Sequence, residues 1–233
     1  MINIADSLQS AYAQIKEITK KYHRAADAVD LLAVSKTKPA ELIIAAYQQG
    51  HRKFGENYAS EAAQKVADLS AYQEIEWHFI GPIQSNKTRL LANDFHWVHT
   101  IDREKIAQRL NDQRDPNREP MNVLIQVNIS GETSKAGVSP QEISELALAI
   151  SKMPQLTLRG LMAIPQKTTD ASEQRLAFRQ MHDCFAQLAS QYAKTDTKID
   201  TLSMGMSSDL DAAIAEGSTM VRVGTAIFGA REP

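Results

Sequence analysis

Eight short apolar segments alternate with segments of helical periodicity along the chain. The apolar segments are rich in Val, Ile and Leu and are bounded by Gly, Pro or polar residues, which is typical of buried strands. Because helical segments separate them, consecutive strands run parallel and are joined by right-handed crossovers. Eight such units close into a (β/α)8 TIM-type barrel, with a doubly wound open sheet as the alternative. We expect the strands at residues 29–34, 52–55, 75–80, 95–100, 121–129, 156–164, 199–204 and 220–223.

An extra helix precedes the first predicted strand. Within the first 22 residues, apolar side chains recur at helical spacing and acidic side chains lie between them, a pattern unlike that of a signal or transit peptide. The composition does not change abruptly anywhere along the chain. We therefore expect residues 1–233 to form one domain, an α/β barrel with an added N-terminal helix.

Composition excludes several classes of partner. The chain of 233 residues is 43% hydrophobic and 23% charged, which is typical of a soluble globular protein. A formal net charge of -2 gives no general attraction to nucleic acid or to anionic membranes. Apolar runs are shorter than the roughly 20 residues that span a bilayer. With a single cysteine, Cys184, the chain also suits a reducing compartment. We expect a cytoplasmic protein with no nucleic-acid or membrane partner.

A lysine stands at the carboxyl end of the first predicted strand. Side chains alternate across a strand, so Lys36 shares a face with Val34 and Leu32. If that face is the interior, burial disfavours the ammonium form and leaves more free amine, which can react with an aldehyde. Lys38 has the same parity but lies beyond the strand, beside a proline, where a solvated lysine is expected.

The loops after strands seven and eight are rich in small residues. In barrels of this type, phosphate groups commonly bind at these two places. Residues 203–209 read Ser-Met-Gly-Met-Ser-Ser-Asp, and residues 222–226 read Arg-Val-Gly-Thr-Ala. Glycine lets the backbone approach a ligand closely, and hydroxyl and backbone N–H groups donate to a phosphate. Ser207 and Thr225 are the hydroxyls that we select.

A reactive lysine and a phosphate cradle together predict a phosphorylated carbonyl compound as ligand, with pyridoxal phosphate the first candidate. Arg222 has the parity of Gly224 and points inward if the barrel forms. An arginine donates hydrogen bonds but gives up a proton reluctantly, so it would face an unprotonated ring nitrogen. A cofactor held in this way is a weak electron sink.

The chain also resembles the pyridoxal phosphate homeostasis protein family over nearly its whole length. The resemblance lies in LLAVSKTKP, FGENYASEA, EWHFIGPIQSNK, LRGLMAIP and LSMGMSSDLDAAIAEGSTMVRVGTAIFG. It implies a single barrel similar to the N-terminal domain of alanine racemase that holds pyridoxal 5'-phosphate as an internal aldimine. By this resemblance, Lys36 is the Schiff-base lysine, Arg222 faces the pyridine nitrogen, and Ser207, Gly224 and Thr225 bind the phosphate.

Three further residues are assigned to the cofactor-binding wall by the same resemblance. Asn57 belongs to the Gly-Glu-Asn-Tyr turn after the second strand, while Ser203 and Met206 belong to the loop after the seventh. The resemblance implies that the protein buffers and carries the cofactor, with effects on vitamin B6 and amino-acid metabolism, and without established turnover. Its expected partners are pyridoxal phosphate and apo forms of enzymes that use it, and a monomer is expected.

Two enzymatic alternatives stay open. A racemase needs a second base, and a tyrosine that racemases carry four positions after the lysine is Ala40 here. The sequence ends at Pro233, nine residues after Gly224, so we expect no second domain to supply that base. A Schiff-base aldolase would also use a barrel lysine and a phosphate site, but without a bound cofactor.

Other polar residues have less specific patterns. His96 and His99 are three apart on a strand and so face opposite sides, which argues against a shared metal. His78 could line the site or be packed. Lys135, in the long loop after the fifth strand, could receive an aldehyde, although a solvated loop charge is favoured. The pair Asn86-Lys87 belongs to the family resemblance, and the residues themselves assign it no role.

Overall fold

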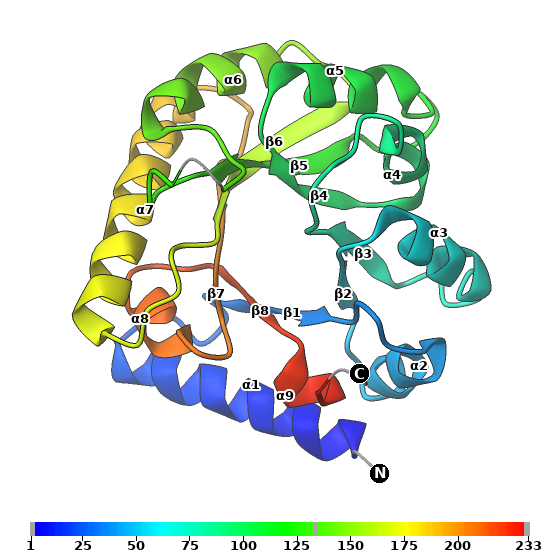
Figure 1. Ribbon diagram of the computed structural model, residues 1–233, viewed down its shortest axis with the longest axis vertical. Helices are drawn as coiled ribbons and strands as arrows, with labels where there is room; N and C mark the ends of the chain where they lie inside the picture. The colour runs from blue at the N-terminus through cyan, green and yellow to red at the C-terminus, as the bar shows by residue number, and fades with distance from the viewer. Residues whose placement is uncertain (1–2, 133–134, 231–233) are drawn as a thin grey trace.

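The structure, a computed structural model, describes residues 3–132 and 135–230. This part of the chain contains eight parallel strands that close into a barrel, each strand pairing with the next and the last with the first (Figure 1). The TIM-type barrel predicted from the sequence is confirmed. The strands are β1 (Asp30–Val34), β2 (Lys53–Glu56), β3 (Glu76–Phe79), β4 (Trp97–Ile101), β5 (Met121–Val127), β6 (Leu156–Ala163), β7 (Thr201–Met206) and β8 (Met220–Val223).

Helices surround the barrel and connect its strands (Figure 1). The additional N-terminal helix α1 packs against α2, α8 and α9, on the side where the first and last strands meet. Asn3 caps α1 by accepting hydrogen bonds from the backbone N–H groups of Ala5 and Asp6. The helices are α1 (Ile4–Lys21), α2 (Ala40–Gln48), α3 (Ala59–Asp68), α4 (Thr88–Asp94), α5 (Glu104–Gln113), α6 (Ile143–Ile150), α7 (Ala171–Tyr192), α8 (Leu210–Ala215) and α9 (Thr225–Phe228), with a short 3-10 turn at Pro140–Glu142.

The structure differs from the predicted elements mainly near the seventh and eighth strands. The predicted strand 199–204 lies two residues later, because β7 continues through Gly205 and Met206 still pairs with Arg222 of β8. Gly205 has a φ of 96°, a conformation that glycine adopts without strain. Helix α9 was missed, since four residues are too short to show helical periodicity. The prediction that residues 1–233 form one domain stays a prediction.

The main apolar core fills the space between the barrel and the helices. Inside the barrel, smaller apolar clusters form around Leu32, Ile80 and Met220, and around Trp97, Leu124 and Met162. Polar side chains that share the inward parity of these residues are buried as well: His78, His99, Ser203 and Arg222. The interior of this barrel therefore combines apolar contacts with a buried polar network.

Among the residues that the structure describes, helices long and apolar enough to cross a membrane are not found.

Candidate functional site

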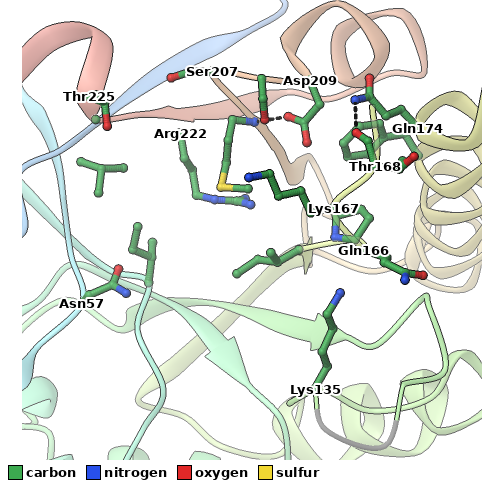
Figure 2. Close-up of a pocket in the computed structure, with 18 of the residues that line it drawn as sticks. Asn57, Lys135, Gln166, Lys167, Thr168, Gln174, Ser207, Asp209, Arg222 and Thr225 are labelled. Atoms are coloured by element: carbon green, nitrogen blue, oxygen red, sulfur yellow. Dashed lines mark hydrogen bonds between the residues drawn. The ribbon is translucent and has the colours of Figure 1, made fainter. Parts of the chain in front are cut away.

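A cavity of about 580 Å³ opens at the carboxyl ends of the strands, where TIM-type barrels carry their sites (Figure 2). Its volume is that of pockets which bury a small organic ligand. Both apolar and polar side chains line it, and these come from β1, β8 and the loops that follow several strands. The lining residues are Val34, Lys36, Asn57, Ile80, Lys135, Ile164, Pro165, Gln166, Lys167, Thr168, Gln174, Phe178, Met206, Ser207, Ser208, Asp209, Arg222, Gly224 and Thr225.

Lys36 reaches the cavity because of its position relative to β1. The strand ends at Val34, which packs inside the barrel with Leu32. Two residues further on, Lys36 keeps this inward parity, and its side chain lines the cavity while remaining partly exposed. The predicted orientation of Lys36 therefore agrees with the structure.

The turn that carries Lys36 has an unusual backbone conformation. Thr37 has a φ of 59°, which β-branched residues rarely adopt. Its backbone N–H donates to Glu61 Oε1 at 2.6 Å, and the N–H of Lys38 donates to the carbonyl of Ser35 at 3.1 Å. Such a conformation persists only when the surroundings fix it, and here helix α3 supplies one of the fixing contacts.

A buried ionic cluster lies behind this turn, between β1, β2 and α3. Glu56 is fully buried, and its Oε1 accepts from the hydroxyl of Ser35 at 2.6 Å and from Lys65 Nζ at 2.9 Å. Lys65 also donates to the Ser35 carbonyl at 2.8 Å and to Glu61 at 2.6 Å. Burial raises the pKa of Glu56, and the charge of Lys65 opposes that shift. The cluster therefore holds the residue immediately before Lys36.

The loops after β7 and β8 form the neighbouring wall and carry Ser207 and Thr225, which line the same cavity as Arg222 (Figure 2). The N–H of Met206 donates to Asp209 Oδ1 at 2.5 Å, which fixes the first loop. A Cβ at Gly224 would lie 3.1 Å from the carbonyl oxygen of Val34, so glycine lets the second loop pass close to β1. This wall offers hydroxyl groups and a backbone that passes close to β1.

Arg222 supplies the buried positive charge of the site and is 4% exposed. Its Nη1 donates to the carbonyl and the hydroxyl of Ser203, both at 2.8 Å, and its Nη2 donates to the carbonyl of Ala163 at 2.9 Å. Burial lowers the pKa of Arg222 to about 10, so the guanidinium stays protonated at neutral pH. A guanidinium has five N–H donors, so Arg222 can keep these bonds and still donate to a ligand.

Asn57 lies on the opposite side of the cavity from the β7 and β8 loops (Figure 2). The segment that follows β3 passes tightly against its backbone, because a Cβ at Gly81 would lie only 1.9 Å from the carbonyl oxygen of Asn57. Glycine at position 81 therefore fixes how closely the loops after β2 and β3 approach each other.

The structure brings together seven of the eight predicted site residues, all of which lie in its described part. The exception is Ser203, which does not line the cavity: it is fully buried beneath Arg222. The prediction counted Ser203 with the loop that follows the strand, but β7 runs from Thr201 to Met206 and Ser203 lies within it. Ser203 therefore contacts Arg222, which in turn faces the cavity.

Sequence reasoning missed most of the outer wall of the cavity and named only Lys135 as a possible part of it. The loop after β6, residues 164–168, lines it together with Gln174 of α7, whose Nε2 donates to the Thr168 carbonyl at 2.8 Å. Lys135 lines it too and pairs with Glu132 at 2.5 Å, so it is more than the solvated loop charge that the sequence favoured. The position of these loops after strands five and six was the available signal.

The chain is similar to known proteins over nearly its whole length. The family model for the alanine racemase N-terminal domain matches residues 7–232. A Vibrio cholerae protein named pyridoxal phosphate homeostasis protein is 54% identical over 235 residues, covering 100% of this chain and 98% of its own. A protein of the same name from Escherichia coli K12 is 51% identical, again covering 100% and 98%. The chain belongs to the pyridoxal phosphate homeostasis protein family.

Solved structures agree with membership of the pyridoxal phosphate homeostasis protein family. PipY of Synechococcus elongatus, in a structure with pyridoxal phosphate bound, is 35% identical, with a TM-score of 0.82 and coverage of 97% of this chain and 100% of PipY. Alanine racemase from Corynebacterium glutamicum has a TM-score of 0.71 at 17% identity, and this chain covers 62% of it. The racemase likeness shows the shared barrel fold.

Proposed function

We propose that this protein binds pyridoxal phosphate in the cavity and serves vitamin B6 homeostasis by holding the cofactor and releasing it. The observation that carries the proposal is that Lys36, just after β1, and Arg222 of the neighbouring strand β8 face one cavity, beside the loops after β7 and β8. Relatives named for pyridoxal phosphate homeostasis and the ligand-bound PipY structure support it.

The residues of the cavity fit the chemistry of this ligand. Pyridoxal phosphate carries an aldehyde, a phosphate and a ring nitrogen. Lys36 offers an amine for the aldehyde, and Ser207 and Thr225 offer hydroxyl donors for the phosphate. Gly224 lets the backbone come close, and Arg222 offers a buried donor that suits an unprotonated ring nitrogen. Asn57 and Met206 complete the wall that we assign to the cofactor.

We further propose that the cofactor is attached covalently to Lys36. In forming this bond, the Lys36 nitrogen attacks the aldehyde carbon, and the aldehyde oxygen leaves as water. When bound, the group can act as an electron sink for amino acids. Arg222 keeps its own proton, because its pKa of about 10 lies well above neutral pH. A sink facing this donor is weak, which favours storage and delivery over turnover.

The test of cofactor attachment is the visible absorption spectrum followed by borohydride reduction and peptide mass mapping. The wild-type protein is expected to be yellow and to yield a reduced pyridoxyl adduct on Lys36. Lys36→Ala should lose both signals. Lys38→Ala is the matched control, since Lys38 is two residues away and donates to the Ala230 carbonyl instead. A colourless wild type that takes up no added pyridoxal phosphate would refute the proposal.

Carrier and enzyme functions are separated by two further assays. The carrier proposal expects the loaded protein to reactivate an apo-enzyme that uses pyridoxal phosphate. It also expects α-proton exchange of amino acids in deuterium oxide to be no faster than with free pyridoxal phosphate. Faster exchange would favour a racemase-type enzyme. The proposed monomeric state and single domain predict one protomer mass by light scattering and one cooperative unfolding transition.

A further inference from the structure

A chain of hydrogen bonds crosses the barrel interior and ends at Arg222. Glu76 Oε1 lies 2.8 Å from His78 Nε2, and His78 Nδ1 lies 2.9 Å from His99 Nε2. His99 Nδ1 lies 3.1 Å from the Ser203 hydroxyl oxygen, which accepts from Arg222 Nη1 at 2.8 Å. We call these five residues the interior chain; they come from β3, β4, β7 and β8.

The interior chain joins the two ends of the barrel. Arg222 lines the cavity at the carboxyl ends of the strands. Glu76, the first residue of β3, lines a separate hollow together with Asp30, Lys53 and Asp200, which lie at or next to the amino ends of their strands. Side chains that contact Arg222 through hydrogen bonds therefore extend to the opposite mouth of the barrel.

The middle of the interior chain is shielded from water. His78, His99 and Ser203 are fully buried. The His78 ring also stacks on Trp97, with ring centroids 5.3 Å apart and planes 9° apart. Burial lowers the pKa of both histidines below the ordinary value, so both imidazoles are neutral at neutral pH.

The two ends of the interior chain fix the direction of every proton in it. Arg222 only donates, and Glu76 only accepts when ionised. Burial acts to raise the pKa of Glu76, whereas the hydrogen bond with His78 and the charge of Lys53 act to lower it, and the pKa is lowered overall. A neutral imidazole donates from one nitrogen and accepts at the other. His78 must therefore donate from Nε2 to Glu76 and accept at Nδ1 from His99.

The same reasoning sets the hydroxyl of Ser203. His99 donates from Nε2, so its Nδ1 accepts, and the Ser203 O–H points to it. This leaves a lone pair of Ser203 for Arg222. Reversing His78 would bring two acceptors together at Glu76, and reversing His99 alone would bring two acceptor nitrogens together between the imidazoles; a buried site tolerates either poorly.

We propose that His78 and His99 are positioning residues for Arg222. By fixing the Ser203 hydroxyl, they hold its lone pair toward the guanidinium and so set the direction in which Arg222 presents its remaining donors to the cavity. The proton directions follow from the interior chain alone. Only the predicted response of a bound ligand rests on the proposed function.

The first experiment measures histidine tautomers in the protein without ligand, by long-range proton–nitrogen correlation NMR. His78 and His99 are expected to be neutral, each with its proton on Nε2. The exposed His182 supplies a surface ring for comparison. A proton on Nδ1 of either buried ring, or a charged ring at neutral pH, would overturn the proposed directions. This measurement needs neither a variant nor the cofactor.

The second experiment compares His99→Gln with His99→Phe after loading with ¹⁵N-labelled pyridoxal phosphate. A glutamine amide can both donate and accept, as His99 does, whereas phenylalanine fills the space without bonds. His99→Phe is expected to shift the pyridine nitrogen resonance and to weaken binding about tenfold, the effect of losing one hydrogen bond. His99→Gln should restore both to near the wild-type values.

Controls separate this effect from a loss of packing. His51→Phe replaces another buried histidine, outside the interior chain, and should leave the pyridine resonance in place. If His99→Phe fails to fold, Ser203→Ala carries the same prediction, because it removes the hydroxyl that contacts Arg222. Equal resonances in wild type, His99→Phe and Ser203→Ala would refute the positioning role. A wild type that binds no ligand would refute the proposed function instead, while the tautomers still test the interior chain.

Discussion

Replacing Lys65 by methionine tests the ionic cluster behind the Lys36 turn. Methionine keeps the length and apolar stem of lysine but removes the ammonium group. Glu56, which is fully buried, then keeps the Ser35 hydroxyl bond but loses its positive partner. The Ser35 carbonyl also loses the bond that it accepts from Lys65. A buried carboxylate without its counter-charge is expected to destabilise the folded state strongly.

The expected magnitude follows from the burial of the pair. Breaking a buried ion pair by removing one partner costs about 3–5 kcal/mol. With an unfolding entropy of about 2.1 cal/mol/K per residue, a chain of 233 residues changes its melting temperature by about 2 °C per kcal/mol. Lys65→Met should therefore melt about 6–10 °C below the wild type near pH 8.

The same variant should show a characteristic pH dependence. Burial raises the pKa of Glu56 above its ordinary value of 4.5, so above pH 4.5 the folded protein binds more protons than the unfolded chain. The contribution of Glu56 to the free energy of unfolding therefore falls as pH rises, by at most about 1.4 kcal/mol per pH unit. Without Lys65 this pKa rises further and the fall continues to higher pH. The loss of unfolding free energy caused by Lys65→Met should be small near pH 5 and largest near pH 8.

Thermal and urea unfolding between pH 5 and pH 8 measure this effect. The double variant Glu56→Gln with Lys65→Met should lose the added pH dependence, because its buried side chain no longer ionises. Lys53→Met is the matched control: it breaks an exposed ion pair with Asp30 and should cost less than about 1 kcal/mol. A penalty for Lys65→Met that stays constant with pH, or that matches the control, would refute the reasoning.

Two further substitutions have definite expected outcomes. Gly81→Ala should lower the melting temperature by more than Gly50→Ala, because its Cβ meets the Asn57 carbonyl oxygen at 1.9 Å whereas the Cβ at position 50 meets open space; equal losses by calorimetry would contradict this. His51 has its pKa lowered to about 4 by burial, so the stability that it contributes above pH 6.5 is lost as pH falls toward 4, roughly 3 kcal/mol in all. In His51→Phe the acid-side decline in unfolding free energy should be shallower by that amount, and an unchanged slope would argue against a buried neutral ring.

Local sequence pattern was sufficient for the residues nearest the cavity. The parity of β1 predicted that Lys36 points inward, and the parity of β8 did the same for Arg222. The small residues after strands seven and eight lie where the barrel architecture requires them. These predictions depend only on a strand period of two and on the order of the elements, both of which can be read along the chain.

Contacts between distant segments were not predictable in this way. Sequence pattern left open whether His78 was packed, and the family resemblance placed Ser203 on the cavity wall, because neither position shows what the residue on a neighbouring strand will be. Lys65 gave no signal either, since a lysine on a polar helix face is usually solvated and here is buried by an ion pair. Such contacts require the register between strands and the packing of α3.

The site lies across the pairing of β1 with β8, where Leu32 is opposite Arg222 and where Gly224 passes close to Val34 (Figure 1). A ligand that contacts both Lys36 and Arg222 therefore bridges the segments of the first and the last strand and binds only after the barrel has closed. A nascent chain that still lacks β8 has no complete site. Once bound, a ligand at a hundred times its Kd stabilises the closed barrel by about 2.7 kcal/mol. A ligand bound as proposed would thus raise the free energy of unfolding of each closed barrel, so ligand supply and barrel stability would be coupled.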